Sequence, residues 1–222
     1  MNKYKVLILV MFFIITFSLA ETHAIINDYS LLGKTIYLDA GHGGLDSGAI
    51  SNKIVEKDMN LVLVKTLEEK LIAKGATVYV TREDDSDLST SSYNRKRSDL
   101  YNRAKLINDS KCDMYISIHL NSTTSKTWRG LQIFYNNVLK ENGEIAKVIN
   151  QTLKDNLSNI RDIKLENDYY MYKYIKVPGI LIEVGFISNP DDNYLLRQED
   201  YRDKLTNYIA VGIENYFNQN IS

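Results

Sequence analysis

The sequence predicts a single α/β domain in which a mostly parallel sheet is covered by helices on both faces. Beyond the first 30 residues, short apolar segments typical of strands alternate with segments of helical period, and this alternation is typical of such sheets. The 222 residues fit one domain of ordinary size. The single cysteine, Cys112, excludes an intramolecular disulfide framework, so the fold must depend on its core.

The first strand is predicted at residues 34–39, an apolar run that ends in the glycine-rich loop 41–44. A helix is expected over residues 56–74, because four apolar residues recur there at every fourth position and a glycine follows as a stop. The next strand is predicted at residues 77–81.

Residues 83–96 are polar and show neither period, which predicts a surface loop near the site. A helix is then expected at 97–108 and a strand at 114–119. The polar segment 121–129 carries the only tryptophan, and a further strand follows at 130–135.

A helix is predicted at residues 140–157, and a mixed, tyrosine-rich segment follows at 159–177. A proline and a glycine introduce an apolar strand that runs through Val184. The asparagine and proline at 189–190 are typical of a helix N-cap and first position, and the last long helix is expected at 199–217.

The N-terminus is predicted to lie outside this domain. Two lysines precede an apolar run from Val6 to Ala20, and small residues stand before a possible cleavage point at Glu21. Residues 1–24 are therefore expected to be a signal peptide or, if uncleaved, a signal anchor. Either alternative predicts an exported, extracytoplasmic domain that touches the membrane only through this segment.

The formal net charge of −1 argues against a nucleic-acid surface, so no nucleic-acid partner is expected. The function must then come from a local site. Three side chains able to bind a metal are candidates: His42 in the first loop, Glu56 at the start of a helix and His119 at the end of a strand. Because the carboxyl ends of parallel strands meet at one edge of a sheet, these side chains can converge.

Two histidines and one glutamate form a known set of zinc ligands that leaves one coordination position open for chemistry. Glu183 places a fourth carboxylate within an apolar strand, where an unpaired charge is costly. It is the natural candidate for a general base. The predicted chemistry is hydrolysis of an amide by water whose pKa zinc lowers to roughly 7.

Each of these residues also has a structural interpretation. The alternatives are a turn residue at His42, a first-turn acid at Glu56, a core histidine at His119, and a buried partner of Arg82 or Arg103 at Glu183.

Taken together, four segments resemble the zinc-dependent N-acetylmuramoyl-L-alanine amidases, the Amidase_3 family of cell-wall hydrolases. The segments are residues 36–49, 56–61, 115–122 and 177–189. The resemblance implies a catalytic domain over residues 33–218 with a mixed, roughly six-stranded sheet. It also implies one zinc ion held by His42, Glu56 and His119, and catalysis by Glu183. The implied substrate is peptidoglycan, cleaved between the lactyl group of N-acetylmuramic acid and L-alanine.

Within the family the chain looks most like the short germination-specific type, as judged from residues 95–103, 118–121 and 128–130. That likeness implies removal of stem peptides from spore cortex during sporulation, the first step towards muramic-δ-lactam. Because no wall-binding repeat is recognisable in the sequence, the catalytic domain is expected to find its substrate either through its own surface or through an activating or targeting protein partner.

The tyrosines before Glu183 depart from the family, whose members often have a leucine-arginine pattern there. One hypothesis is an aromatic rim for glycan or partner, and the alternative is ordinary half-buried tyrosines. The rim would consist of Trp128, Tyr169, Tyr170, Tyr172 and Tyr174.

Three other functions are alternatives. A dinucleotide-binding loop is disfavoured because Asp46 stands where the third glycine would be. A zinc peptidase acting within the stem peptide would use the same chemistry and differs only in its products. The third alternative is a regulatory protein with the same fold that is catalytically inactive or depends on a partner.

Overall fold

The computed structural model describes residues 3, 5, 8, 10–16, 29–51 and 53–219. The predicted signal segment, 1–24, falls largely outside these residues, and of it residues 10–16 are helical. No helix within the described part of the chain is both long and apolar enough to cross a membrane.

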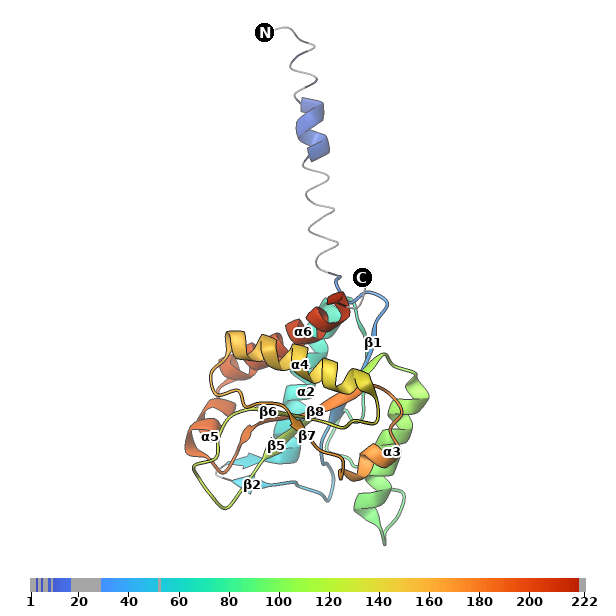
Figure 1. Cartoon of the computed structure of the whole chain (residues 1–222), viewed down its shortest axis with the longest axis vertical. Coiled ribbons are helices and arrows are strands. Elements are labelled where there is room, and N and C mark those ends of the chain that lie inside the picture. The colour runs from blue at the N-terminus through green and yellow to red at the C-terminus, as the bar shows by residue number, and fades with distance from the viewer. Residues whose placement is uncertain are drawn as a thin grey trace.

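Strands and helices alternate along the described chain (Figure 1). The strands are β1 (Thr35–Ala40), β2 (Ile50–Ser51), β3 (Ile54–Val55), β4 (Thr77–Val80), β5 (Met114–Asn121), β6 (Gln132–Tyr135), β7 (Lys164–Leu165) and β8 (Gly179–Phe186). The helices are α2 (Glu56–Ala73), α3 (Arg95–Ser110), α4 (Lys140–Asn156), α5 (Pro190–Leu196) and α6 (Glu199–Gln219), with the 3-10 turn η1 at Tyr170–Lys173.

Six strands form one sheet in the order β4-β1-β5-β8-β6-β7. Strands β4, β1, β5 and β8 are mutually parallel, and β6 runs antiparallel to β8. The short strands β2 and β3 pair separately as an antiparallel hairpin just before α2. The predicted α/β class and the mixed, mostly parallel sheet are therefore confirmed.

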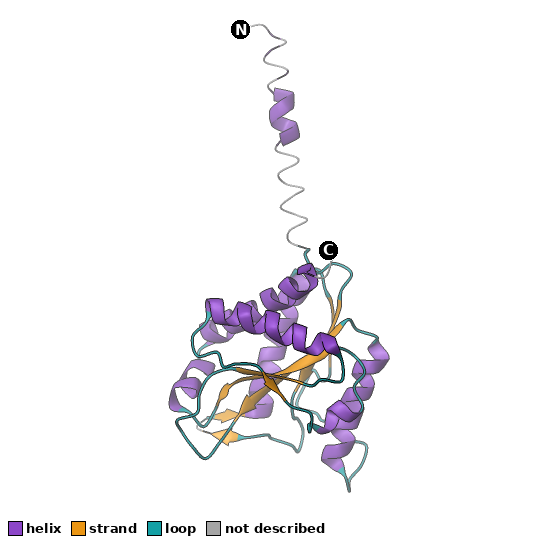
Figure 2. Cartoon of the chain, viewed as in Figure 1, coloured by secondary structure: helices purple, strands orange, loops and turns teal. Residues whose placement is uncertain are grey.

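Helices cover both faces of the sheet (Figure 2). Helices α2, α4 and α6 pack together on one face, while α3 and η1 pack on the other. Because successive side chains of a strand point to opposite faces, each strand serves both layers. In β1, Ile36 and Leu38 belong to the core under α2, α4 and α6, whereas Tyr37 belongs to the smaller core beside α3.

The same alternation places the candidate site. In β5, Ile116 and Ile118 enter the larger core, so Ser117 and His119 face the layer of α3 and η1. Glu183 is the register partner of His119 on the adjacent β8. The end of the sheet therefore presents polar side chains on one face and hydrocarbon on the other.

Most predicted elements agree with the structure to within two residues at each end. The N-cap at Asn189 is confirmed, because its side chain accepts hydrogen bonds from the backbone N–H groups of Asp191 and Asp192. The elements missed from the sequence are β2, β3, β7 and η1. Each spans only two to four residues, which is too short to show a period.

Candidate metal centre

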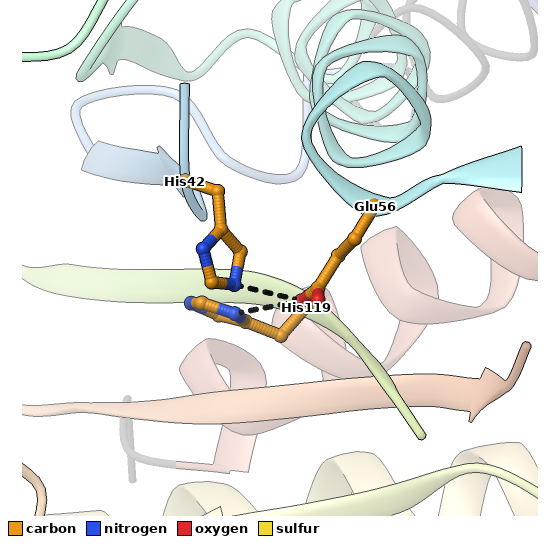
Figure 3. Close-up of side chains that lie close together, drawn as sticks. All are labelled: His42, Glu56 and His119. Carbon is orange, nitrogen blue, oxygen red and sulfur yellow. Dashed lines mark hydrogen bonds and ion pairs between the residues drawn. The ribbon is translucent and has the colours of Figure 1, made fainter. Parts of the chain in front are cut away.

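His42, Glu56 and His119 come from three separate elements and meet at one edge of the sheet (Figure 3). His42 lies in the loop after β1, Glu56 is the first residue of α2, and His119 lies near the end of β5. One ligand atom from each residue lies within 4.8 Å of the others. The structure therefore brings together the three residues that the sequence singled out.

The carboxylate of Glu56 lies at the centre of this group. Its Oε1 is 3.0 Å from Nε2 of His42 and 3.2 Å from Nδ1 of His119. Backbone N–H groups hold the same carboxylate in place: Leu120 donates to Oε1 at 3.1 Å and Ala49 donates to Oε2 at 2.8 Å. The position of Glu56 is thus fixed by the end of β5 and by the loop before β2.

Two glycines leave room for the side chains of His119 and Glu56. A Cβ atom on Gly41 would lie 2.3 Å from Cε1 of His119. A Cβ atom on Gly48 would lie 2.6 Å from Oε2 of Glu56, and Gly48 has a φ of +63°. His42 itself adopts a left-handed φ of 62°, a conformation that is uncommon for a residue with a side chain.

The charges of the group favour a charged Glu56. Burial alone would raise the pKa of Glu56, but the hydrogen bonds and charges of His119 and His42 outweigh it and lower that pKa strongly. Burial likewise acts to lower the pKa of His42, but Glu56 and Asp46 outweigh it and raise that pKa. Oδ2 of Asp46 lies 3.0 Å from Nδ1 of His42, within ion-pair distance although the two atoms are not aligned as a hydrogen bond.

Glu183 lies beside this group without a partner. Its Oε2 is buried and has no hydrogen-bond partner among the described residues. Burial and, to a lesser degree, the negative charge of Glu56 raise the pKa of Glu183 to about 7, although the two histidines oppose the shift. A carboxyl with such a pKa can both accept and return a proton near neutral pH.

A cavity of about 410 Å³ opens over these side chains. His42, His119 and Glu183 line it on the side of the sheet, and Tyr169 and Tyr172 line it on the side of η1. Phe134 and Leu181 add an apolar wall, and Glu166 and Asp168 add carboxylates. Three of the four predicted site residues therefore face a space large enough for a ligand, and Glu56 lies behind His42 and His119 without lining it.

The arginine alternative for Glu183 is wrong. Arg103 is fully buried and pairs with Asp39 and Asp99, each at 2.7 Å. Arg82 donates to backbone carbonyls and forms no ion pair within the described part of the chain. Both candidate partners are thus already engaged elsewhere, and Glu183 is left free to act on a ligand.

Only part of the hypothesised aromatic rim lies at the cavity. Tyr169 and Tyr172 line it, whereas Tyr170 and Tyr174 are joined to each other through their hydroxyls at 3.0 Å. Trp128 stacks elsewhere, with the guanidinium of Arg161 4.6 Å from the centre of its ring.

One residue beside His42, Asp46, is not predicted as a site residue from the sequence. Asp46 stands four residues after His42, inside the family-like segment 36–49, where the sequence gives it no role of its own. A loop gives no periodic signal by which the side chain could be placed against the imidazole.

The donor set fits a zinc ion. Two imidazole nitrogens and one carboxylate oxygen are the ligands that catalytic zinc takes when one position stays open. His119 and Glu56 are buried, and His42 is half-buried with its ring at the cavity. The open position would therefore face the cavity.

The chain is similar to known amidases over most of its length. The family model for N-acetylmuramoyl-L-alanine amidase (Amidase_3) matches residues 36–215. The germination-specific N-acetylmuramoyl-L-alanine amidase of Bacillus subtilis is 44% identical over 194 residues, which cover 85% of this chain and 82% of that protein.

Solved structures give the same result. The CwlD amidase from Clostridioides difficile, solved in complex with the GerS lipoprotein, superposes with a TM-score of 0.80 at 37% identity, covering 84% of this chain and 100% of that one. An N-acetylmuramoyl-L-alanine amidase from Clostridium difficile 630 superposes with a TM-score of 0.75 at 33% identity, covering 83% and 97% of the two chains. The chain therefore belongs to the N-acetylmuramoyl-L-alanine amidase family.

Proposed function

We propose that this protein is a zinc-dependent amidase that hydrolyses the amide between the lactyl group of N-acetylmuramic acid and L-alanine in peptidoglycan. One observation carries the proposal. In a chain of the amidase family, two imidazole nitrogens and a carboxylate oxygen converge within 4.8 Å, and an unpartnered carboxylate lies beside them at the same cavity.

In this proposal His42, Glu56 and His119 hold the metal. Bound zinc would supply a Lewis acid that lowers the pKa of water to roughly 7 and polarises the scissile carbonyl. Asp46 acts on the ring of His42 through its charge: its carboxylate lies 3.0 Å from Nδ1 and so favours a proton on Nδ1, which leaves Nε2 free for the metal.

Glu183 moves the proton. Its carboxylate accepts a proton from water as the water oxygen attacks the scissile carbonyl carbon. The same carboxyl then gives the proton to the amide nitrogen as the C–N bond breaks, which frees the amino group of L-alanine and leaves the lactyl carboxylate. The apolar strand around Glu183 suits both steps, because it keeps the pKa of this carboxyl well above that of an exposed glutamate.

We further propose that the substrate is spore-cortex peptidoglycan and that the reaction is the first step towards muramic-δ-lactam. The support is the germination-specific relative at 44% identity. Deleting the gene should remove muramic-δ-lactam from the spore muropeptides, as chromatography with mass spectrometry would show. Unchanged lactam content would contradict this assignment.

A protein partner and export are proposed on separate grounds. The structural neighbour CwlD is in complex with the GerS lipoprotein, so we expect this chain to bind a lipoprotein. Co-purification of the tagged chain from sporulating cells tests this.

Residues 1–24 are proposed as the export segment, and N-terminal sequencing of the mature protein would show whether cleavage precedes Glu21.

The amidase proposal is tested by incubating peptidoglycan with the zinc-loaded chain and identifying the products by mass spectrometry. Stem peptides with free N-terminal L-alanine are expected, and Glu183→Gln should bind zinc yet release none. Glu144→Gln, an exposed substitution on α4, is the matched control and should remain active. Fragments cut within the stem peptide would indicate a peptidase, and zinc binding without turnover would indicate a regulatory protein.

A further inference from the structure

Arg82 is buried behind the loop that carries His42, and it has no carboxylate partner in the described structure. The residue is 4% exposed. Its guanidinium makes four hydrogen bonds, all to backbone carbonyls: Nε to Ala40 at 3.0 Å, Nη1 to Asp84 at 2.9 Å, and Nη2 to Gly41 at 3.2 Å and Lys57 at 2.6 Å. Burying a charge without an ion-pair partner is costly, and the more distant carboxylates of Asp39, Asp58 and Asp85 do not offset the effects of burial and of Arg103, which lower the pKa of Arg82. Fold stability alone therefore explains this arginine poorly.

Two of the four carbonyls adjoin metal-binding residues. Gly41 directly precedes His42, and Lys57 directly follows Glu56. Because a single nitrogen, Nη2, donates to both carbonyls, it ties the loop after β1 to the first turn of α2. The distance between the loop and the helix therefore sets the distance between two of the three proposed ligands, His42 and Glu56.

The surroundings of Arg82 are arranged around this contact. A Cβ atom on Gly43 would lie 3.0 Å from Cδ and Nε of Arg82, so the glycine leaves space for the side chain. Asn60 donates its side-chain amide to the same Gly41 carbonyl at 3.1 Å. Lys57 reaches back to the carbonyl of Gly44 at 3.0 Å. The loop is thus held to α2 at several points, with Arg82 next to the ligands.

The loop needs such support because His42 adopts a left-handed backbone conformation. A residue with a side chain keeps that conformation only when its surroundings impose it. Metal–ligand distances tolerate changes of only about 0.2 Å, so a loop that relaxes away from α2 would lose affinity even if the domain remained folded.

We propose that Arg82 is a positioning residue of the metal centre, which sets zinc affinity by fixing the His42 loop against the first turn of α2. This inference rests on the proposed function, because it requires that the site takes zinc. Lysine cannot replace arginine here, since one ammonium group cannot reproduce the planar fork that reaches four carbonyls.

The test compares the full chain as wild type, Arg82→Lys and Arg202→Lys. Arg202 is the matched control, because its Nη1 also donates to a backbone carbonyl, that of Leu196 at 2.9 Å, but away from the ligands. The zinc dissociation constant is measured by competition with a chelating dye, and the melting temperature is measured with and without zinc. Arg82→Lys should weaken zinc binding about 10- to 100-fold and shrink the zinc-induced rise in melting temperature. Arg202→Lys should change neither.

A purely structural role would lower the melting temperature equally with and without zinc and leave the dissociation constant unchanged, which would refute the inference. If Arg82→Lys does not fold, Arg82→Gln, which buries no charge, is measured in the same way. A wild-type chain that binds no zinc refutes the proposed metal centre and this inference with it. A wild type that binds zinc, together with an Arg82 variant of equal affinity, refutes only the role of Arg82.

Discussion

Asp39 is fully buried at the end of β1, and we predict that its replacement by asparagine lowers the free energy of unfolding substantially. Its carboxylate pairs with Arg103 at 2.7 Å and accepts the hydroxyl proton of Ser117 at 2.6 Å. Arg103 in turn donates to the carbonyl oxygen of His42 at 2.6 Å. Asp39 therefore neutralises a buried cation that donates to the loop carrying His42.

The loss in the free energy of unfolding can be estimated from the buried charge of Arg103 that remains after Asp39→Asn. Removing one member of a buried ion pair costs roughly 3 to 5 kcal/mol, because the other charge loses its counter-ion. Arg103 would keep Asp99 as a second carboxylate, so the lower end, about 3 kcal/mol, is expected. For a domain of this size that corresponds to a drop in melting temperature of about 6 to 12 °C.

The effect also has a defined pH dependence. Burial opposes the charged form of Asp39, but Arg103 and Ser117 outweigh it and hold the pKa of the folded state below the ordinary value. A carboxyl whose folded pKa is lowered stabilises the protein above its unfolded pKa of about 3.9, and that contribution is lost as the pH falls through the folded value. The difference between wild type and Asp39→Asn should therefore be complete at pH 7 and shrink below about pH 4.

The difference in the free energy of unfolding between wild type and Asp39→Asn is measured by urea unfolding at pH 7 and below about pH 4, with circular dichroism as the signal. Asp162→Asn is the control: its carboxylate pairs with Lys154 at the surface, and its loss should leave stability unchanged within error. A loss of less than about 1 kcal/mol for Asp39→Asn at pH 7 would refute the buried-pair reasoning, because it would mean that the charge of Arg103 is compensated without Asp39.

Three further predictions concern the site itself. Gly41→Ala should abolish zinc binding, measured by isothermal titration calorimetry, because the new Cβ would lie 2.3 Å from the ring of His119; wild-type affinity would contradict this. Tyr172→Phe removes a buried hydroxyl that has no partner among the described residues, so the zinc-free melting temperature should stay equal or rise, and a clear fall would show that the hydroxyl is bonded. Glu183→Gln should raise the zinc-free melting temperature more at pH 8 than at pH 5. The reason is that burial raises the pKa of Glu183 to about 7, so the wild type loses stability as the pH rises through that value; an equal effect at both pH values would argue against a raised pKa.

The elements that carry the site could be predicted from the sequence because their signals are local. An apolar run ends just before the His42 loop, another ends near His119, and a four-residue apolar period begins near Glu56. A parallel sheet then brings strand ends to one edge without further information.

The contacts that fix those side chains could not be predicted in this way. Arg103 lies 64 residues from Asp39 in the chain, and Arg82 lies 25 residues from Lys57. Residues so far apart give no periodic signal in the sequence. A backbone carbonyl can belong to any residue, so the sequence does not show which carbonyl will accept a hydrogen bond from an arginine. Glu183 was for the same reason open to pairing with either arginine until the structure showed both engaged elsewhere.

The proposed addition of water across the lactyl amide by Glu183 and the metal-binding residues has a direct test. The reaction is run on peptidoglycan in water enriched in oxygen-18, and both products are analysed by mass spectrometry. We expect one oxygen-18 atom in the new lactyl carboxylate of muramic acid and an unlabelled peptide with a free amino group on L-alanine. Label in a peptide carboxylate instead, or no label in either product, would contradict this proposal.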